Sequence, residues 1–223
     1  MSRAPAAASP GALLPLAEAD LRALQRDLLE AHGPLGAWWP GEEPFEIAVG
    51  AVLVQRSRWE QAAASIANLR GAGLLEPGRL AAADEDRIRD LVRGSGFAST
   101  KPGRLLALAR WTLERGPTAS ELSDGDLRTE LLAVEGIGEE TADAIALYCF
   151  SRPAFICDEY ARRLLTLRGH AVPGSYRAFR RRLAPALDRA RFSVPELAEL
   201  HGLIVEEGKA SPARRGVQAG ASA

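Results

Sequence analysis

Apolar residues recur along this chain at the three- to four-residue spacing of helices, and no stretch shows the alternation of a strand. Residues 18–31 place Leu21, Leu24 and Leu28 on one face. Residues 44–54 are apolar nearly all round, which is typical of a buried helix. We expect further helices over 59–70, 77–83, 84–93, 102–115, from Ser123 or Asp124 to about 134, 139–150, 158–168, 175–190 and 195–208. The pattern predicts an all-α protein of about ten helices, with the 102–115 helix ending at Gly116-Pro117.

Composition narrows the class of protein. Of 223 residues, 47% are hydrophobic and 26% are charged, as in an ordinary soluble globular protein. No run of eighteen apolar residues exists to span a membrane, and the apolar stretch near the N-terminus is too short for a secretory signal. We therefore expect a cytoplasmic protein with disordered tails at residues 1–10 and 210–223.

Cysteine and histidine usage excludes several kinds of cofactor site. Cys149 and Cys157 are the only cysteines, too few for a disulfide framework, a four-cysteine zinc site or a cysteine-ligated iron–sulfur cluster. His32, His170 and His201 are scattered, without the spacing of metal ligands. The sequence predicts no bound metal and no cofactor.

Charge indicates a possible binding surface in one segment of the chain and not in the chain as a whole. The net charge of −1 and the isoelectric point of about 6.3 do not indicate nucleic-acid binding. One late segment is nevertheless crowded with arginines against Asp188 alone: Arg177, Arg180, Arg181, Arg182, Arg189 and Arg191. Such a run is either a solvated helix face or a surface for phosphates.

The stretch VEGIGEETADAI has the pattern of two helices joined by a glycine turn. Gly136 and Gly138 permit positive φ and close approach, and Ile137 between them is suited to fill the gap between the helices. The amides of the turn and of the next helix's first residues have no internal acceptor, so they suit an anion such as a DNA phosphate. A plain helical hairpin explains the glycines equally well. Glu139 and Glu140 complement the helix dipole and need not face the anion.

GIGEETADAI, an apolar segment and Asp158 in AFICDEYARRLL together resemble the helix-hairpin-helix signature of the endonuclease III superfamily of DNA glycosylases. The stretches FEIAVGAVLVQRSRWEQAAASIANL, GFASTKPGRLLALA and ELHGLIVEEGK resemble other segments of that superfamily, so the likeness covers roughly residues 20–209. It implies two helical lobes: a central bundle over 42–150 with the hairpin at 131–150, and a second lobe from 11–41 plus 151–209. It also implies a monomer acting on damaged double-stranded DNA in the nucleoid.

The resemblance assigns roles to individual residues. Asp158 becomes the catalytic carboxylate, although a residue that opens a helix also serves as an N-cap. Gln55 becomes the residue that intercalates where a nucleotide is flipped out, although it also suits a polar cap on a buried helix. The phosphate-binding set is Gly136, Ile137, Gly138, Glu139, Thr141 and Lys101. Backbone carbonyls of the hairpin are also candidates to hold a monovalent cation.

Two departures select a branch of the superfamily. Glu140 stands where lyase-active members carry the lysine that attacks the sugar, and a carboxylate cannot form that imine. The four cluster cysteines are missing as well. With Trp38-Trp39-Pro40 before the first buried helix, the chain is similar to the 3-methyladenine DNA glycosylase III group, whose base pocket would comprise Trp38, Trp39, Pro40 and Trp59 here. Trp59 stands where phenylalanine is expected.

The implied chemistry suits these residues. An alkylated purine carries positive charge, which makes it a good leaving group and favours stacking on an indole face. Asp158 would then stabilise the sugar cation and direct a water. The sequence thus predicts a monofunctional glycosylase in base excision repair for alkylated purines. Two alternatives stay open: an enzyme of this architecture for oxidised or mismatched pyrimidines, and a helix-hairpin-helix module that binds DNA without catalysis.

Overall fold

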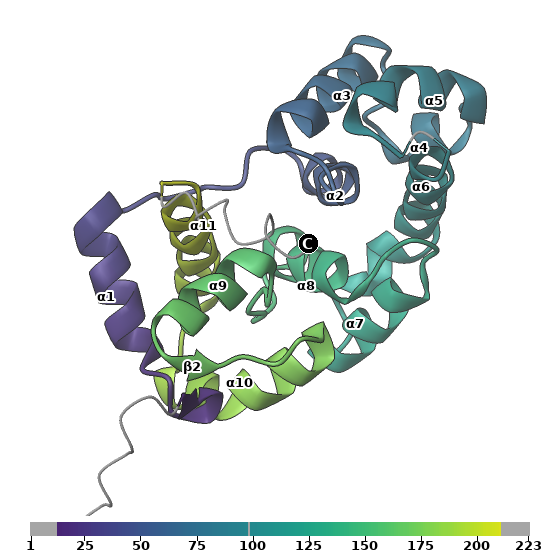
Figure 1. Cartoon of the computed structure of the whole chain (residues 1–223). Coiled ribbons are helices and arrows are strands. Elements are labelled where there is room, and N and C mark those ends of the chain that lie inside the picture. The colour runs from purple at the N-terminus through teal and green to yellow at the C-terminus, as the bar shows by residue number, and fades with distance from the viewer. Residues whose placement is uncertain (1–12, 98, 211–223) are drawn as a thin grey trace, which may run out of the picture. The chain divides into compact units, whose positions relative to one another are not determined.

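The computed structural model describes residues 13–97 and 99–210 (Figure 1). The expected N-terminal tail, and all of the expected C-terminal tail except Ala210, lie outside the described residues. The described chain is helical apart from one pair of two-residue strands, which confirms the all-α class. None of its helices is both long and apolar enough to cross a membrane.

The chain divides into two compact units. Unit 1 contains the described residues 13–34, 157–191 and 203–210, and unit 2 contains Leu35–Ile156 and Phe192–Gly202. The elements of unit 2 are α2 (Pro44–Leu53), α3 (Trp59–Gly71), α4 (Pro77–Ala81), α5 (Glu85–Val92), η2 (Arg93–Ser95), α6 (Lys101–Ala119), α7 (Asp124–Ala133) and α8 (Glu139–Phe150). Those of unit 1 are β1 (Leu14–Pro15), η1 (Leu16–Glu18), α1 (Leu21–His32), α9 (Glu159–Leu167), β2 (His170–Ala171) and α10 (Tyr176–Ala190), while α11 (Val194–Ala210) contributes to both units.

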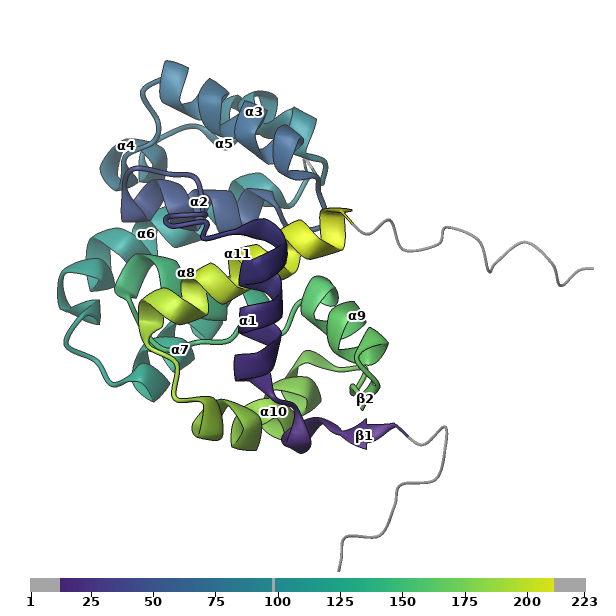
Figure 2. The same cartoon turned by 90° about the vertical axis from the view of Figure 1, so that its left-hand side faces the viewer.

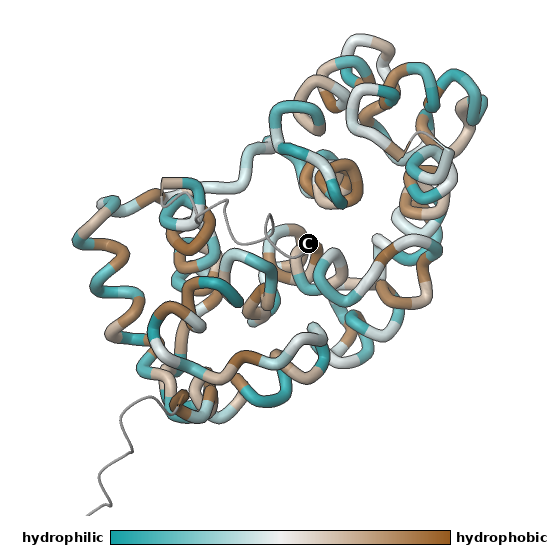
Figure 3. The backbone as a smooth tube through the Cα atoms, in the orientation of Figure 1, coloured by the Kyte–Doolittle hydropathy of each residue, from teal (hydrophilic) through white to brown (hydrophobic). Residues whose placement is uncertain are grey.

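Helix α2 forms the centre of unit 2, as its uniformly apolar sequence predicts. Every residue from Ala48 to Leu53 is buried, and Figure 3 shows this coil mostly in hydrophobic brown. Proline at the start of the helix costs no hydrogen bond, since the first-turn amides have no intrahelical acceptor. The helix packs against α3, α6 and α8, so one buried element aligns α8, the second helix of the hairpin, with α3 and α6.

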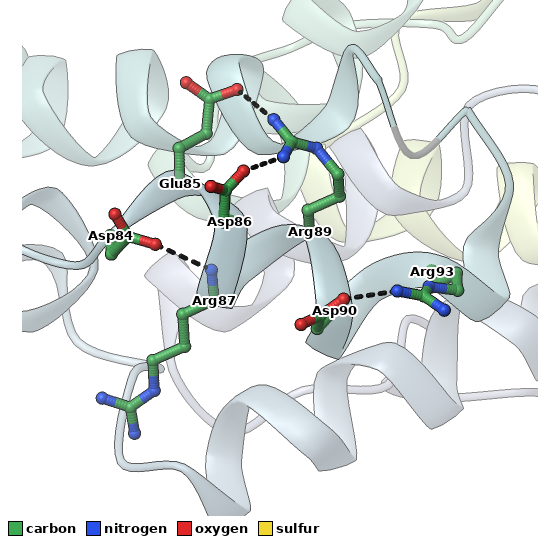
Figure 4. A network of polar contacts seen from close by, with 7 residues as sticks. All are labelled: Asp84, Glu85, Asp86, Arg87, Arg89, Asp90 and Arg93. Carbon is green, nitrogen blue, oxygen red and sulfur yellow. Dashed lines mark hydrogen bonds and ion pairs between the residues drawn. The ribbon is translucent and has the colours of Figure 1, made fainter.

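Helix α5 shows the opposite pattern, with one buried edge and a charged outer face. Ile88 and Val92 are fully buried, while the Asp84 side chain caps the helix by accepting from the Arg87 amide at 3.1 Å. Arg89 pairs with Glu85 and Asp86, and Arg93 pairs with Asp90 (Figure 4). Such exposed pairs each contribute about 0.3–0.5 kcal/mol, so the two apolar residues anchor this helix.

In unit 1, the N-terminal segment lies against α10, as Figure 2 shows. The Arg189 guanidinium donates to the carbonyls of Ala17 and Ala19 at 2.5 and 3.5 Å. Arg22 on α1 donates to the carbonyls of Ala190 and Arg191 at 2.8 and 3.0 Å. The two Arg22 bonds satisfy carbonyls at the end of α10, where the helix provides no amide partner.

The prediction that the chain has no strand was wrong at one point. Leu14–Pro15 pairs in parallel with His170–Ala171. Two residues are too few to produce an alternating pattern, and Pro15 sits on an edge where its missing N–H costs no ladder bond.

The predicted end of the 102–115 helix was also wrong. Helix α6 continues through Gly116 and Pro117 to Ala119. A proline inside a helix removes one backbone bond, but here it lies in the last turn, and Ala119 beyond it is fully buried. Tertiary burial therefore outweighs the local stop signal.

Candidate functional site

The hairpin consists of α7, a turn over residues 134–138, and α8, which lie side by side in unit 2 (Figures 1 and 2). Ser123 caps α7 by accepting from the Asp126 amide at 3.1 Å. Val134 and Ile137 are buried in the turn, and the Ile137 amide donates to the Val134 carbonyl at 3.1 Å. The side chain of Ile137 is buried and its amide is already hydrogen-bonded, so the donors available to a phosphate come from the residues that follow it.

Two glycines shape the turn in different ways. Gly136 has φ +81, and a Cβ there would collide with the side chain of Arg104. Glycine is thus needed at 136 for both conformation and space. Gly138 has extended backbone, and a Cβ there would meet nothing within 4 Å. The space directly beside Gly138 is therefore open.

The N-terminus of α8 lies where the sequence analysis predicted an anion site. Gly138 occupies the N-cap position and supplies no side-chain cap to the first turn. Such a terminus combines outward-pointing amides with the positive end of the helix dipole. Glu139 is half-buried and Glu140 is exposed in that first turn.

Arg128 on α7 offsets the acids of this hairpin. Its Nε lies 2.6 Å from Asp143 Oδ1, and a terminal nitrogen lies 3.7 Å from Glu139 Oε1. Asp143 is only 1% exposed, so its carboxylate depends on this ion pair. Neither residue was predicted from the sequence, although an aspartate within the buried run TADAIAL is itself a signal that a partner is required.

Gln55, which follows the end of α2, binds the hairpin turn. Its Nε2 donates to the Gly136 carbonyl at 3.0 Å and to the Thr141 hydroxyl at 2.9 Å. Its Oε1 accepts from an Arg104 nitrogen at 2.5 Å. Thr141 is buried, and its hydroxyl is used in this contact. Only the backbone amide of Thr141 could therefore bind a phosphate.

Lys101 was predicted to contact phosphate, and the structure contradicts that role. The side chain is fully buried, and its Nζ donates to the carbonyls of Leu53 and Ser95, each at 2.6 Å. These carbonyls end α2 and η2, where intrahelical donors are lacking. Burial, and then the charge of Arg104, lower the pKa of Lys101 to about 8.

Five aromatic rings of unit 2 form one cluster: Trp38, Trp39, Trp59, Tyr148 and His201. Trp39 is at the centre, with its ring centroid 4.9 Å from that of Tyr148 and 6.0 Å from that of Trp59. Three of the four residues predicted to form a base pocket therefore meet, while Pro40 is exposed beside them. Sequence analysis did not place Tyr148 or His201 in this group.

Small residues make room for the cluster. A Cβ at Gly202 would lie 2.6 Å from Trp38 Cγ, so only glycine lets this indole lie against α11. Gly50 on α2 faces Trp39 and Trp59, where a Cβ would make ordinary contacts at 3.6–3.7 Å. The buried indole N–H of Trp39 has no hydrogen-bond partner among the described residues. An unpaired buried donor of this kind costs about 1–3 kcal/mol.

Tyr148 and His201 tie the cluster together. The Tyr148 oxygen lies 2.7 Å from His201 Nδ1 and 3.1 Å from the Ala198 carbonyl. His201 is buried, and its ring stacks on Trp39 with an interplanar angle of 21°. These contacts join α8 to the part of α11 that belongs to unit 2.

Asp158 lies in unit 1 at the start of α9. Its Oδ1 accepts from the Ala161 amide at 2.7 Å, so the residue caps the helix as the alternative interpretation predicted. Capping and catalysis are compatible, because the cap orients the carboxylate and uses one oxygen. The preceding amide, of Cys157, donates to the Tyr176 hydroxyl at 3.3 Å, which fixes the approach to Asp158.

The chain's two lysines are poorly suited to act as lyase nucleophiles. Lys101 has the lowered pKa of a reactive amine, but it is fully buried and held by two carbonyls. Lys209 is ion-paired to Glu206 at 2.9 Å. The position of Glu140 carries only a carboxylate.

One further exposed aromatic residue bears on ligand binding. The ring of Phe97 is 49% exposed with φ +51, and the Arg56 guanidinium lies 5.2 Å from its centroid. A strained, exposed aromatic of this kind is a candidate for contact with a ligand. In the described part of the chain, no group of three or more His, Cys, Asp or Glu residues has the arrangement of a metal site.

A family model built from known proteins matches most of this chain. Residues 49–203 match the family of HhH-GPD superfamily base excision DNA repair proteins. A putative DNA repair glycosylase of Methanocaldococcus jannaschii is 36% identical over 147 residues, which cover 64% of this chain and 66% of that protein. Endonuclease III of Sulfolobus acidocaldarius is 28% identical over 166 residues, 74% of this chain and 72% of that enzyme.

A solved structure is also similar to this chain. The 3-methyladenine DNA glycosylase of H. pylori, bound to 1,N6-ethenoadenine, is 28% identical with a TM-score of 0.73, covering 88% of this chain and 98% of that one. The family match spans more than half of the chain and includes the hairpin, Gln55 and Asp158. The chain therefore belongs to the HhH-GPD superfamily of base excision DNA repair proteins.

Proposed function

We propose that this protein is a monofunctional DNA glycosylase that hydrolyses the N-glycosidic bond of alkylated purines. The observation that carries the proposal is the cluster of Trp38, Trp39 and Trp59. Indole faces stack on a cationic purine. The likeness to a 3-methyladenine glycosylase that binds 1,N6-ethenoadenine supports the same class of base.

The hairpin is proposed to hold the DNA backbone. The uncapped N-terminus of α8 and the open space beside Gly138 favour a phosphate at the turn. Such contacts fix the register of the protein on DNA but carry no information about the base. Choice of lesion therefore falls to the aromatic cluster.

Asp158 is proposed to carry the chemistry. A positively charged base leaves without a general acid, so the reaction needs a group that stabilises the developing sugar cation and orients water. A carboxylate fixed at a helix N-terminus does both. Glu140, in the position of a lyase lysine, cannot form an imine, so we expect the DNA backbone to stay intact.

The test measures which base is released. Incubation with methylated, oxidised and undamaged duplex DNA, followed by mass spectrometry of the freed base, should detect alkylated purines alone. Asp158→Asn should abolish base release, by at least about 100-fold, while DNA binding is retained. The N-cap persists in this variant because the amide oxygen still accepts from Ala161.

Each alternative function predicts a different result in these assays. Release of oxidised or mismatched pyrimidines would replace the proposed substrate class, and release of no base from any duplex would favour a DNA-binding module. Borohydride trapping of a covalent protein–DNA adduct would show that the protein is a lyase.

A further inference from the structure

We infer that Gln55 and Arg104 form a clasp that positions the phosphate-binding turn, and that Gln55 acts there as a positioning residue. The inference rests on the proposed role of the hairpin in DNA binding. It assigns Gln55 a different task from insertion into the base stack, and it gives Arg104 a role that no sequence pattern indicated.

Three hydrogen bonds build the clasp. The Gln55 amide nitrogen reaches the Gly136 carbonyl at 3.0 Å and the Thr141 hydroxyl at 2.9 Å, which lie on either side of Gly138. The Gln55 amide oxygen accepts from Arg104 on α6 at 2.5 Å. Residues from the end of α2 and from α6 thus hold the turn and the first turn of α8 at fixed spacing.

The chemistry allows only one orientation of the Gln55 amide. A carbonyl oxygen requires a donor, and a guanidinium offers only donors, so the NH₂ must face Gly136 and the oxygen must face Arg104. A charge-assisted bond to arginine is about twice as strong as a neutral one. Arg104 therefore fixes the orientation of Gln55, and Gln55 fixes the turn.

The packing at Gly136 supports the same conclusion. The Arg104 side chain occupies the space that a Cβ at Gly136 would need. The turn is therefore held from one side by the Arg104 stem and tied by the Gln55 amide. Insertion of Gln55 into DNA would break all three of its hydrogen bonds and leave the Gly136 carbonyl without this donor.

The test is a double-mutant cycle on affinity for undamaged duplex DNA, measured by fluorescence anisotropy. Gln55→Met and Arg104→Met should each raise Kd about tenfold, equivalent to about 1.4 kcal/mol. The double variant should bind no more weakly than the weaker single variant, because either change opens the whole clasp. Arg110→Met, which removes the same charge from an exposed position of α6, is the matched control and should leave Kd within about twofold.

A second measurement needs no DNA. Amide hydrogen exchange over residues 134–141 should be faster in both single variants than in wild type, and unchanged in Arg110→Met. In single-turnover reactions on an alkylated duplex, Gln55→Met should raise the half-saturating protein concentration and keep the maximal rate. Thermal melts establish that each variant is folded.

Other results would overturn the clasp. If Gln55 were an inserted residue, its substitution would lower the maximal rate and leave the affinity for undamaged DNA and the exchange rates unchanged. If Arg104 simply contacted a phosphate, the two changes would add, and Arg104→Met would reduce the salt dependence of binding by about one phosphate. Binding without base release would defeat the proposed glycosylase and leave the clasp standing, since neither Kd nor exchange depends on catalysis.

Discussion

At the scale of single residues, Asp143 places a carboxylate in the buried interior of the hairpin. It is 1% exposed, and Arg128 is its ion-pair partner. We predict that Arg128→Met lowers the free energy of unfolding by about 3 kcal/mol, because it leaves a buried charge without that partner. Urea denaturation measures the loss, and Arg128→Met combined with Asp143→Leu should recover most of it.

A matched control lies on the neighbouring pair of helices. Arg115 on α6 pairs with Glu130 on α7, where the arginine side chain is 46% exposed. The hydrogen bond from Arg115 lowers the pKa of Glu130, but water hydrates this carboxylate readily when the arginine is absent. Arg115→Met should therefore destabilise the protein far less than Arg128→Met, and equal losses would refute the assignment of a special role to the buried pair.

The sequence motifs located candidate site residues in this chain, but they did not identify the groups that those residues contact. The sequence identified Lys101 and Gln55 as members of recurring segments, but their contacts include the backbone carbonyls of Leu53, Ser95 and Gly136. Backbone carbonyls leave no trace in a residue pattern. The phosphate role that the family resemblance implied for Lys101 is contradicted by its burial.

At the scale of elements, α10 divides its arginines between two tasks. Arg189 is committed to the carbonyls of Ala17 and Ala19. Arg181 and Arg182 are exposed instead. We predict that Arg181→Glu with Arg182→Glu weakens binding to undamaged and alkylated DNA equally, because phosphate contacts do not distinguish bases.

Affinity measured over a series of salt concentrations tests this prediction. The slope of log K against log salt should become shallower by about one for each phosphate that the variant no longer binds. Arg87→Glu, an exposed arginine on α5, serves as the control for a general change in net charge. Weaker binding to lesion DNA alone would count against a phosphate surface on α10.

The order of elements was largely predictable because capping residues in the sequence mark where many of the helices begin. Asp20, Asp84, Ser123 and Ser175 each cap the helix that follows, and their side chains are visible in the sequence. Departures occurred where tertiary contacts decide. Buried Ala119 carries α6 past Pro117, and the pairing of Leu14 with His170 depends on segments more than 150 residues apart.

At the scale of the whole molecule, the candidate site is assembled from segments that the sequence keeps apart. Trp39, Tyr148 and His201 belong to a loop, α8 and α11, and they meet only in the folded chain. The tryptophans were predictable because their spacing resembles a known motif. Tyr148 and His201 were not, because a tyrosine and a histidine on helical faces look like ordinary packing residues.

The burial of Lys101 should make the free energy of unfolding depend on pH. Its pKa is about 8 when folded, below the ordinary lysine value of 10.5. Below pH 8 both folded and unfolded chains carry this proton, so the group adds no pH dependence. Between pH 8 and 10.5 the unfolded chain binds a proton that the folded chain does not, so stability should rise with pH, by on the order of 1 kcal/mol from pH 7 to 9.

Two features of the chain make this prediction measurable. Lys101 and Lys209 are the only lysines, so carbon-13 lysine labelling gives two side-chain signals, which Lys209→Arg assigns. Burial raises the pKa of Cys149 to about 12, so above pH 9 its ionisation in the unfolded chain would lower stability. Urea denaturation should thus stay between pH 7 and 9, where Lys101→Met should flatten the rise and Lys209→Arg should keep it. A Lys101 signal that titrates near 10.5 would show that the folded protein does not desolvate this ammonium.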